Sequence, residues 1–336
     1  MAQDLPAPFA TLPVSGPDAM PDIVVARSIA PSDNSTSIVL ASAAGPQIRI
    51  GDVGVTAHTD IVYATRVDDG GRDLPLRLDL LVPRTPGAKP VVIYLPGGGF
   101  VLSNKEAALD RRTYVAEAGY AVASAEYRTV RDGATYRDAV ADVKSAIGFL
   151  RSHGARYGLD TSKVAVWGES AGGYLAAMVG VTNTGGVGSD VQAVINQFGA
   201  SNLSAFAADF DPETRQALLR PGTPAAAFVF GPATSLSLAD DPDAVAAADP
   251  ARYVTSGTPP FLHFHGSADN VIPPSQSLLL HTALLEHGVP STRYVLTGAK
   301  HGDLSAMLGD PDAALPWSTT EILGYITGFL AKHLHS

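Results

Sequence analysis

The sequence predicts an α/β fold, with a mostly parallel, doubly wound sheet, antiparallel strands at its N-terminal edge and a small cap-like insertion. Two observations predict it. After Pro90, short and continuous apolar runs alternate with helical stretches, which is the pattern of buried parallel strands joined by crossover helices. Before Pro90, short β-rich runs include one that alternates apolar with polar residues, as antiparallel strands do when one face is exposed. We therefore expect one mixed sheet covered by helices.

Each expected element follows from a local pattern. Antiparallel edge strands are predicted at residues 23–29, 61–67 and 76–82. Parallel strands are predicted at residues 91–95, 121–125, 164–167, 191–198, 261–264 and 294–296. Helical spacing predicts one helix over residues 136–152 and another over residues 275–287. In the second helix, the residues at this spacing are Leu278, Leu279, Thr282 and Leu285.

Length and composition indicate one large domain with an N-terminal arm. A chain of 336 residues fits a single α/β domain, and 46% hydrophobic against 17% charged residues is enough apolar material for a large core. Residues 1–21 are rich in proline and lack periodicity, so they are predicted to form an arm. Residues 22–336 then form one domain. Within it, residues 202–250 interrupt the alternation of strands and helices and are a candidate cap.

Charge and cysteine content argue against several classes of ligand. The formal net charge of −10 argues against nucleic acid or an anionic membrane surface, because clustered Lys and Arg bind both. The absence of cysteine excludes a disulfide framework, a thiolate metal site and a cysteine nucleophile. No apolar run is long enough for a membrane-spanning helix, and the first residues do not resemble a secretory signal. A cytoplasmic protein and an exported one are equally compatible with this sequence, and it does not indicate an oligomeric state.

Residues 168–172, Gly-Glu-Ser-Ala-Gly, match the pattern G-x-S-x-G. Small residues in this pattern allow a strained strand-to-helix turn that exposes the serine hydroxyl. The match has the context that it requires, because a β-branched and aromatic run at residues 164–167 precedes it and an apolar run typical of a buried helix follows at residues 173–179. We therefore predict that Ser170 is a nucleophile, with a structural turn serine as the alternative.

A second motif, Pro-Gly-Gly-Gly-Phe at residues 96–100, directly follows the strand predicted at residues 91–95. Acyl transfer needs donors for the oxygen that becomes negative, and the backbone amides of a glycine-rich loop supply them. Three consecutive glycines cost backbone entropy, which favours close approach of a ligand over a plain turn. Phe100 and Tyr174, with the phenylalanines of residues 202–250, are candidates for an apolar substrate pocket and are equally typical of core.

A serine hydroxyl needs a histidine to accept its proton and a carboxylate to orient the imidazole. Folds with this turn place the carboxylate and then the histidine after the serine. His301 stands alone in a loop after the last predicted strand, so it is the predicted base. The other histidines between the serine and the predicted C-terminal helix lie on or beside a predicted strand or helix: His263, His265, His281 and His287.

Asp269 is the predicted acid because it comes just after a strand end, where the loops of an α/β sheet build sites. Asp303 is the main competitor, but it follows His301 by two residues and cannot easily reach the far ring nitrogen. Glu169 is expected to brace the turn rather than to titrate in catalysis. His263 and His265 share one side of a strand, but two ligands are too few for a metal site, so no metal is predicted.

Together, these motifs resemble bacterial esterases of the α/β-hydrolase fold, in the hormone-sensitive-lipase and feruloyl- or acetylxylan-esterase-like branch. The resemblance runs from about Pro90 to the C-terminus. Its specific parts are residues 96–100, 126–128, 156–160, 168–173, 259–261, 265–269 and 301–302. It implies hydrolysis of carboxylic esters with short acyl or aryl groups, without a cofactor. It also implies an oxyanion hole formed by the amides of Gly98, Gly99 and Ala171.

The resemblance has two departures. Pro96 stands where the hormone-sensitive-lipase branch has a histidine before its glycines. The acid motif at residues 265–269 is more similar to the feruloyl- and acetylxylan-esterase relatives and to the dipeptidyl-peptidase-like hydrolases than to the lipase branch. The resemblance is therefore more specific for the fold than for one subfamily.

Two other functions are compatible with the same residues. A peptidase or amidase uses the same triad, but peptidase relatives usually carry a large N-terminal propeller, for which the roughly 85 residues before the first core strand are too few. A catalytically silent hydrolase fold used for binding is the alternative from another class of protein, and the filled triad positions argue against it. The predicted partner is therefore a small-molecule ester.

Overall fold

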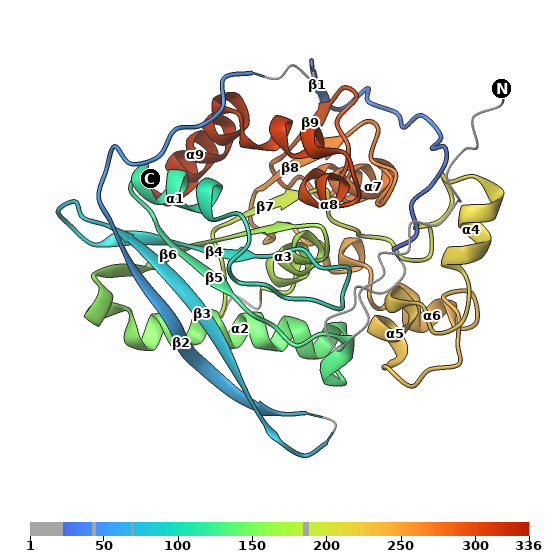
Figure 1. The fold of residues 1–336 in the computed structure, drawn as a ribbon, viewed down its shortest axis with the longest axis horizontal. Helices are drawn as coiled ribbons and strands as arrows, with labels where there is room; N and C mark the ends of the chain where they lie inside the picture. Colours follow the sequence, from blue (N-terminus) through green and yellow to red (C-terminus); the bar gives the residue numbers. More distant parts are fainter. Residues whose placement is uncertain (1–22, 42–44, 69, 184–187, 336) are drawn as a thin grey trace.

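The computed structural model describes residues 23–41, 45–68, 70–183 and 188–335. Within these residues, nine strands form one sheet in the order β1-β9-β8-β7-β6-β4-β5-β3-β2 (Figure 1). All neighbouring pairs are parallel except the two that β3 makes with β2 and β5. The predicted fold class, a mostly parallel sheet with antiparallel strands at its N-terminal edge, is confirmed. The arm predicted at residues 1–21 lies outside the described residues.

The strands overlap every strand predicted from residue 61 onward. Their bounds are β1 Ile38–Leu40, β2 Val55–Val67, β3 Asp73–Pro83, β4 Lys89–Leu95, β5 Ala121–Ala125, β6 Leu159–Glu169, β7 Ala193–Gln197, β8 Phe261–Gly266 and β9 Ser291–Leu296. β1 was not predicted; it has only three residues and pairs with β9 at the other edge of the sheet.

The strand predicted at residues 23–29 is not formed, and this prediction was wrong. The segment bonds to loops instead of the sheet, because Ala26 N donates to Asn270 O at 2.8 Å and Ala30 N donates to Asp209 O at 2.8 Å. Its β-branched residues, Ile23, Val24, Val25 and Ile29, are partly buried. The run of β-branched residues at positions 23–29 therefore indicates burial against loops, not pairing with another strand.

The helices form two layers around the sheet. Their bounds are α1 Leu109–Glu117, α2 Tyr136–His153, α3 Ala171–Val181, α4 Pro212–Leu218, α5 Pro224–Phe230, α6 Pro242–Ala246, α7 Ser275–Glu286, α8 Gly302–Met307 and α9 Thr320–Leu334. The apolar core on one face includes residues of α2, α3 and α7, whereas the core on the other includes residues of α1 and α9. Figure 1 shows α4, α5 and α6, which come from the predicted insertion, gathered at one end of the molecule.

α7 confirms the helix predicted at residues 275–287, but its buried face differs from the predicted apolar spacing. Leu279 and Leu285 are 39% and 42% exposed, whereas Gln276, Ser277 and His281 are buried. Each of these three polar side chains forms a hydrogen bond within the protein. Polar side chains can be buried in a core when they have hydrogen-bond partners there. The spacing of apolar residues in the sequence therefore cannot identify a buried helix face that contains polar side chains.

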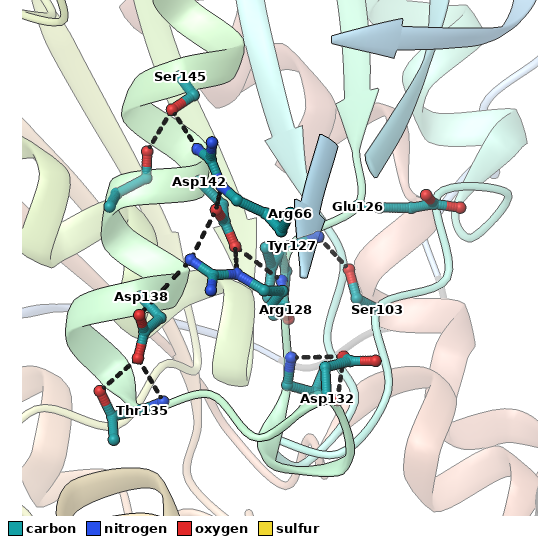
Figure 2. Close-up of polar contacts among 12 residues, drawn as sticks. Arg66, Ser103, Glu126, Tyr127, Arg128, Asp132, Thr135, Asp138, Asp142 and Ser145 are labelled. Atoms are coloured by element: carbon teal, nitrogen blue, oxygen red, sulfur yellow. Dashed lines mark hydrogen bonds and ion pairs between the residues drawn. The ribbon is translucent and has the colours of Figure 1, made fainter. Parts of the chain in front are cut away.

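A buried ionic network holds the loop after β5 (Figure 2). Asp142 of α2 is fully buried and accepts hydrogen bonds from Arg66 Nε of β2 and from Arg128 Nε, both at 2.8 Å. Beside Arg128, the Tyr127 hydroxyl donates to Pro96 O at 2.6 Å. The network thus fixes residues that in turn hold the start of the glycine-rich segment.

Candidate active site

The nucleophile candidate lies on a sharp turn between β6 and α3. β6 ends at Glu169, α3 begins at Ala171, and Ser170 between them has φ 54° and ψ −120°. Such a conformation costs about 1–3 kcal/mol and persists only where its surroundings enforce it. A Cβ on Gly168 would lie 2.1 Å from the carbonyl oxygen of Gly172, so this close turn requires glycine at position 168.

The structure places the three predicted triad residues in one hydrogen-bonded line. His301 Nε2 lies 2.8 Å from Ser170 Oγ, and His301 Nδ1 lies 2.6 Å from Asp269 Oδ2. All three side chains are buried. Asp269 follows β8 and His301 follows β9, so the parallel sheet brings both loops to the edge where β6 delivers the serine.

The surroundings of Asp269 favour its ionised form. Its Oδ1 accepts hydrogen bonds from the backbone amides of Val271, at 3.0 Å, and Ile272, at 2.9 Å. Burial raises the pKa of Asp269, but the charge interaction with His301 and hydrogen bonds from His265 and His301 outweigh burial, so the net pKa lies below its ordinary value. An ionised Asp269 can hold the imidazole with its Nδ1–H toward the acid.

His265 supports the acid from the end of β8. Its Nε2 lies 2.9 Å from Ile272 O and 3.4 Å from Asp269 Oδ2, and its Nδ1 lies 2.9 Å from Ser277 Oγ. Burial lowers the pKa of His265, despite the opposing effect of Asp269. Sequence analysis had placed His265 on a predicted strand, where it lies, without finding this contact. In the sequence, the available indication of this contact was that His265 and Asp269 are four residues apart.

Residues 97–99, the glycine loop, pack against the turn that carries the serine. A Cβ on Gly97 would lie 3.1 Å from the Cβ of Ser170, and a Cβ on Gly98 would lie 2.1 Å from Leu102 O. Gly99 has φ 59°, in the left-handed region that other residues rarely adopt. Larger residues would therefore push the loop away from the serine or strain it.

The three amides predicted as an oxyanion hole border this site. For Gly98 and Gly99, no acceptor of the backbone N–H is found in the described part of the chain. Ala171 is the first residue of α3, and the first amides of a helix have no partner within it. Gly99, Ser170 and Ala171 line the same cavity, so amide donors are available beside the serine hydroxyl.

Two cavities adjoin Ser170. The apolar cavity, of about 110 Å³, is bordered by Gly99 and Ala171. Its apolar side chains include Phe100, Phe206, Leu218, Val271, Ile272 and Leu304. The histidine-side cavity, of about 190 Å³, is bordered by His301 and the glycine loop. Its polar side chains include Tyr94, Asn104, Glu169 and Asp303. The serine hydroxyl thus lies between an apolar and a more polar space.

The structure separates the two aromatic residues predicted to contact a substrate. Phe100 lines the apolar cavity and stacks on Phe228 at a ring-centroid distance of 4.3 Å. Tyr174 is fully buried behind Phe100, at a centroid distance of 5.8 Å, and its hydroxyl donates to Ala248 O at 2.7 Å. Tyr174 lines neither cavity, so its place is one layer further from a substrate than was predicted.

Sequence analysis did not identify Arg111. This residue contacts Glu169 and Asp303, neither of which was predicted to be catalytic. Arg111 of α1 is 2% exposed, its Nη1 lies 3.1 Å from Glu169 Oε1, and its Nη2 donates to Asp303. Asp303, the competing acid, therefore faces Arg111 rather than the ring of His301. Burial raises the pKa of Glu169 to about 7, against the opposing effect of Arg111. The charged helix around Arg111 carries no local signal that distinguishes it from a surface helix.

Two further observations concern the described residues only. They contain no helix with the length and apolar character that crossing a bilayer requires. They also contain no group of three or more His, Asp or Glu side chains placed to hold a metal ion. His263 is fully buried, and its ring stacks on Phe261 at a centroid distance of 5.5 Å.

The sheet order, the serine on the turn after β6, and the acid and histidine after β8 and β9 define an α/β hydrolase. Within this class, residues 78–284 match the model of the BD-FAE family, and the chain belongs to that family. The resemblance inferred from the sequence motifs is confirmed at this level.

The curated relatives that match are esterases. The chain is 29% identical over 283 residues to esterase LipQ of Mycobacterium tuberculosis, covering 79% of this chain and 64% of the relative. It is 32% identical over 251 residues to a probable isoprenylcysteine alpha-carbonyl methylesterase, ICMEL1, of Oryza sativa subsp. japonica, covering 70% and 56%. The chain thus spans less than two thirds of the length of these relatives.

Solved structures with this fold include esterases. A truncated carbohydrate esterase from gut microbiota aligns with a TM-score of 0.70 and 25% identity, covering 87% of this chain and 100% of that one. Esterase 2 of Thermogutta terrifontis, phosphoramylated by tabun, aligns with a TM-score of 0.60 and 25% identity, covering 82% and 94%. The fold of this chain is therefore one on which ester hydrolysis occurs.

Proposed function

We propose that this protein is a serine carboxylesterase that hydrolyses small esters with short acyl or aryl groups. One observation carries the proposal: Asp269, His301 and Ser170 form a continuous hydrogen-bonded line that ends between two cavities. The names of the similar curated proteins, which are esterases, support the same reaction class.

In the proposed mechanism, Ser170 Oγ attacks the ester carbonyl carbon while His301 Nε2 takes the hydroxyl proton. The carbonyl oxygen becomes negative and accepts hydrogen bonds from amides of the glycine loop and of Ala171. His301 then protonates the departing alcohol oxygen, which leaves an acyl group on the serine. Water, deprotonated by His301, hydrolyses the acyl-enzyme, while Asp269 stabilises the imidazolium in both steps.

The two cavities suggest how the ester is oriented. His301 must reach the departing oxygen, so the alcohol belongs in the histidine-side cavity that His301 borders. The acyl group then occupies the apolar cavity beside the amides of Gly99 and Ala171. The side chains that line this cavity are mainly apolar, which suits a hydrocarbon acyl group.

The test compares wild type with Ser170→Ala on a series of p-nitrophenyl esters. We expect kcat to fall by about 10⁶-fold in the variant, since loss of the nucleophile removes the whole triad function. Ser124→Ala is the matched control, because it removes a buried serine hydroxyl that has no hydrogen-bond partner in the described residues and lines neither cavity. A fluorophosphonate probe should label wild type at Ser170.

Three outcomes would contradict the proposal. Equal ester hydrolysis by wild type and Ser170→Ala would exclude Ser170 as the nucleophile. Faster cleavage of a p-nitroanilide than of the ester with the same acyl group would favour an amidase. A folded wild type that neither hydrolyses esters nor reacts with the fluorophosphonate would favour a silent hydrolase fold.

A further inference from the structure

We infer that Arg111 is a positioning residue that joins the serine turn to the histidine loop and so holds Ser170 Oγ against His301 Nε2. The inference rests on the proposed function. Arg111 pairs with Glu169, the residue immediately before the serine, and with Asp303, two residues after the histidine. A single guanidinium thus contacts both segments that carry the reacting pair.

The serine turn needs an external support. Ser170 holds a backbone conformation that residues with a side chain rarely adopt, and such strain persists only where neighbours over-determine it. Its amide donates to Gln197 O at 3.0 Å, which fixes the backbone toward β7. The ion pair between Glu169 and Arg111 fixes the same turn from the opposite helix layer, because α1 packs on the other face of the sheet from α3.

The histidine loop needs a support of the same kind. His301 precedes the six-residue α8, and its backbone amide donates to Ser305 Oγ within that helix at 3.1 Å. This bond ties the histidine to α8 but does not tie α8 to the rest of the site. Asp303, on the first turn of α8, makes that connection through Arg111. A shift of α8 would move His301 relative to Ser170.

The burial of Arg111 has a cost that packing does not explain. A buried ion pair often contributes no more stability than apolar residues of similar volume. Arg111 also leaves its Nε and Nη1 without a hydrogen-bond partner in the described part of the chain, so its contact with Glu169 is an ion pair without a hydrogen bond. A guanidinium nevertheless offers what an apolar residue cannot, because the positively charged N–H groups of its planar fork can pair with two carboxylates from different segments.

Arg111 acts through its two partners rather than on the substrate. Glu169 and Asp303 line the histidine-side cavity, whereas Arg111 lines neither cavity and is 2% exposed. Its loss should therefore leave substrate binding largely unchanged. The expected defect is in the chemical step, which depends on the distance between the hydroxyl and the imidazole.

The experiment compares Arg111→Met with Arg112→Met. Arg112 is the matched control: it is the next residue of α1, it is 1% exposed, and its Nε donates to Ala107 O at 2.7 Å. It contacts neither Glu169 nor Asp303 through an ion pair. Both variants lose a buried guanidinium, so both should lose thermal stability. Sites are counted by fluorophosphonate titration, and kcat for p-nitrophenyl acetate is expressed per titrated site.

For Arg111→Met we expect kcat per site to fall by about 10²-fold with KM nearly unchanged, as a misplacement of about 1 Å would cause. The rate of phosphonylation of Ser170 should fall in parallel, and both rates should fall much less in Arg112→Met. Arg111→Lys should recover only part of the loss, because one ammonium cannot reproduce the fork. Asp303→Asn should show a smaller loss, and adding it to Arg111→Met should cost little more.

Three results would overturn the inference: a kcat per site in Arg111→Met equal to that in Arg112→Met, an increase in KM alone, or losses from Arg111→Met and Asp303→Asn that multiply. If Arg111→Met does not fold, Asp303→Asn still tests the inference. The Asp303 carboxylate is 49% exposed, and its neutralisation leaves the ion pair between Arg111 and Glu169 in place. An unchanged kcat per site in Asp303→Asn would then overturn it. Failure of the proposed function would look different, since Ser170 would not titrate in wild type.

Discussion

Glu169 places a buried carboxylate beside the nucleophile. Its only ion-pair partner in the described residues is Arg111, which also serves Asp303. Glu169 and Asp303 thus share the guanidinium of Arg111, and burial raises the pKa of Glu169. This explains how the residue can brace the turn and still titrate near neutral pH.

This arrangement predicts a pH-dependent stability. Burial raises the pKa of Glu169 from 4.5 to about 7, so the native state binds this proton more tightly than the unfolded chain does. The stabilisation is fully present below about pH 4.5 and is lost as the pH rises through about 7. We expect the Tm of wild type to fall, relative to that of Glu169→Gln, between about pH 5 and about pH 8. Thermal unfolding curves for the two proteins at each pH measure this difference, and a constant difference would contradict it.

Residue patterns were informative where chemistry and chain order restrict the choice. Ser170, Asp269 and His301 each follow a strand end, and their order along the chain left few candidates; the structure places them within hydrogen-bonding distance. Arg111 was not found because its importance comes from two partners remote in sequence. Tyr174 was predicted to contact the substrate, but it is buried behind Phe100. The sequence does not show which of two packed aromatic rings faces a cavity.

At the scale of elements, the inserted residues 202–250 contribute side chains to the apolar cavity next to Ser170. Phe206 precedes α4 and Leu218 ends it, and both line that cavity. The insertion lies at one end of the molecule (Figure 1), and some of its side chains border the cavity beside Ser170. Its predicted role as a cap stays a prediction, but its side chains set the size of the proposed acyl site.

We expect Phe206→Ala to broaden the acyl-chain preference. Truncation of this ring enlarges the apolar cavity, so the ratio of kcat/KM for p-nitrophenyl octanoate to that for the acetate should rise by about tenfold. Leu236→Ala is the control, because Leu236 lies in the same insertion, is 40% exposed and lines neither cavity. The same change of ratio in both variants, or none in Phe206→Ala, would place the acyl group elsewhere.

The parallel strands are the elements that the sequence predicted best. The parallel strands are buried on both faces, so a continuous apolar run identifies each of them. Residues 23–29 and the buried face of α7 were wrong for a common reason. Local patterns show that a segment is partly buried, but loops, strands and hydrogen-bonded polar groups can all provide the buried surface.

At the scale of the whole molecule, the ionic network around Asp142 joins elements that are far apart in sequence (Figure 2). Arg66 comes from β2 at the sheet edge, Arg128 from the loop after β5, and Asp142 from α2 beneath them. Asp142 is completely buried and forms an ion pair with each of the two guanidinium groups. No sequence pattern predicted this network, because its members are separated by whole elements.

We expect Asp142→Asn to lower the free energy of unfolding by about 3–5 kcal/mol, because it leaves two partly buried guanidinium groups without their shared counter-ion. Urea denaturation of wild type and variant measures the loss. Asp138→Asn is the control: Asp138 Oδ1 is 3.5 Å from Arg128 Nη2, its side chain is 40% exposed, and loss of such a pair costs about 1 kcal/mol or less. An asparagine can still accept the hydrogen bonds that Asp138 Oδ2 accepts from Thr135. A loss in Asp142→Asn as small as in the control would mean that the network is not a main support of the fold.

The separation of Ser170 and His301 along the chain, 131 residues, has a consequence for protein synthesis. A ribosome completes β6 and the serine turn well before it makes β8, β9 and the histidine loop. Until those later segments emerge and dock, a nascent chain carries an ordinary unreactive alcohol at this position. Appearance of the proposed activity during translation would therefore report the time at which the last third of the sheet assembles.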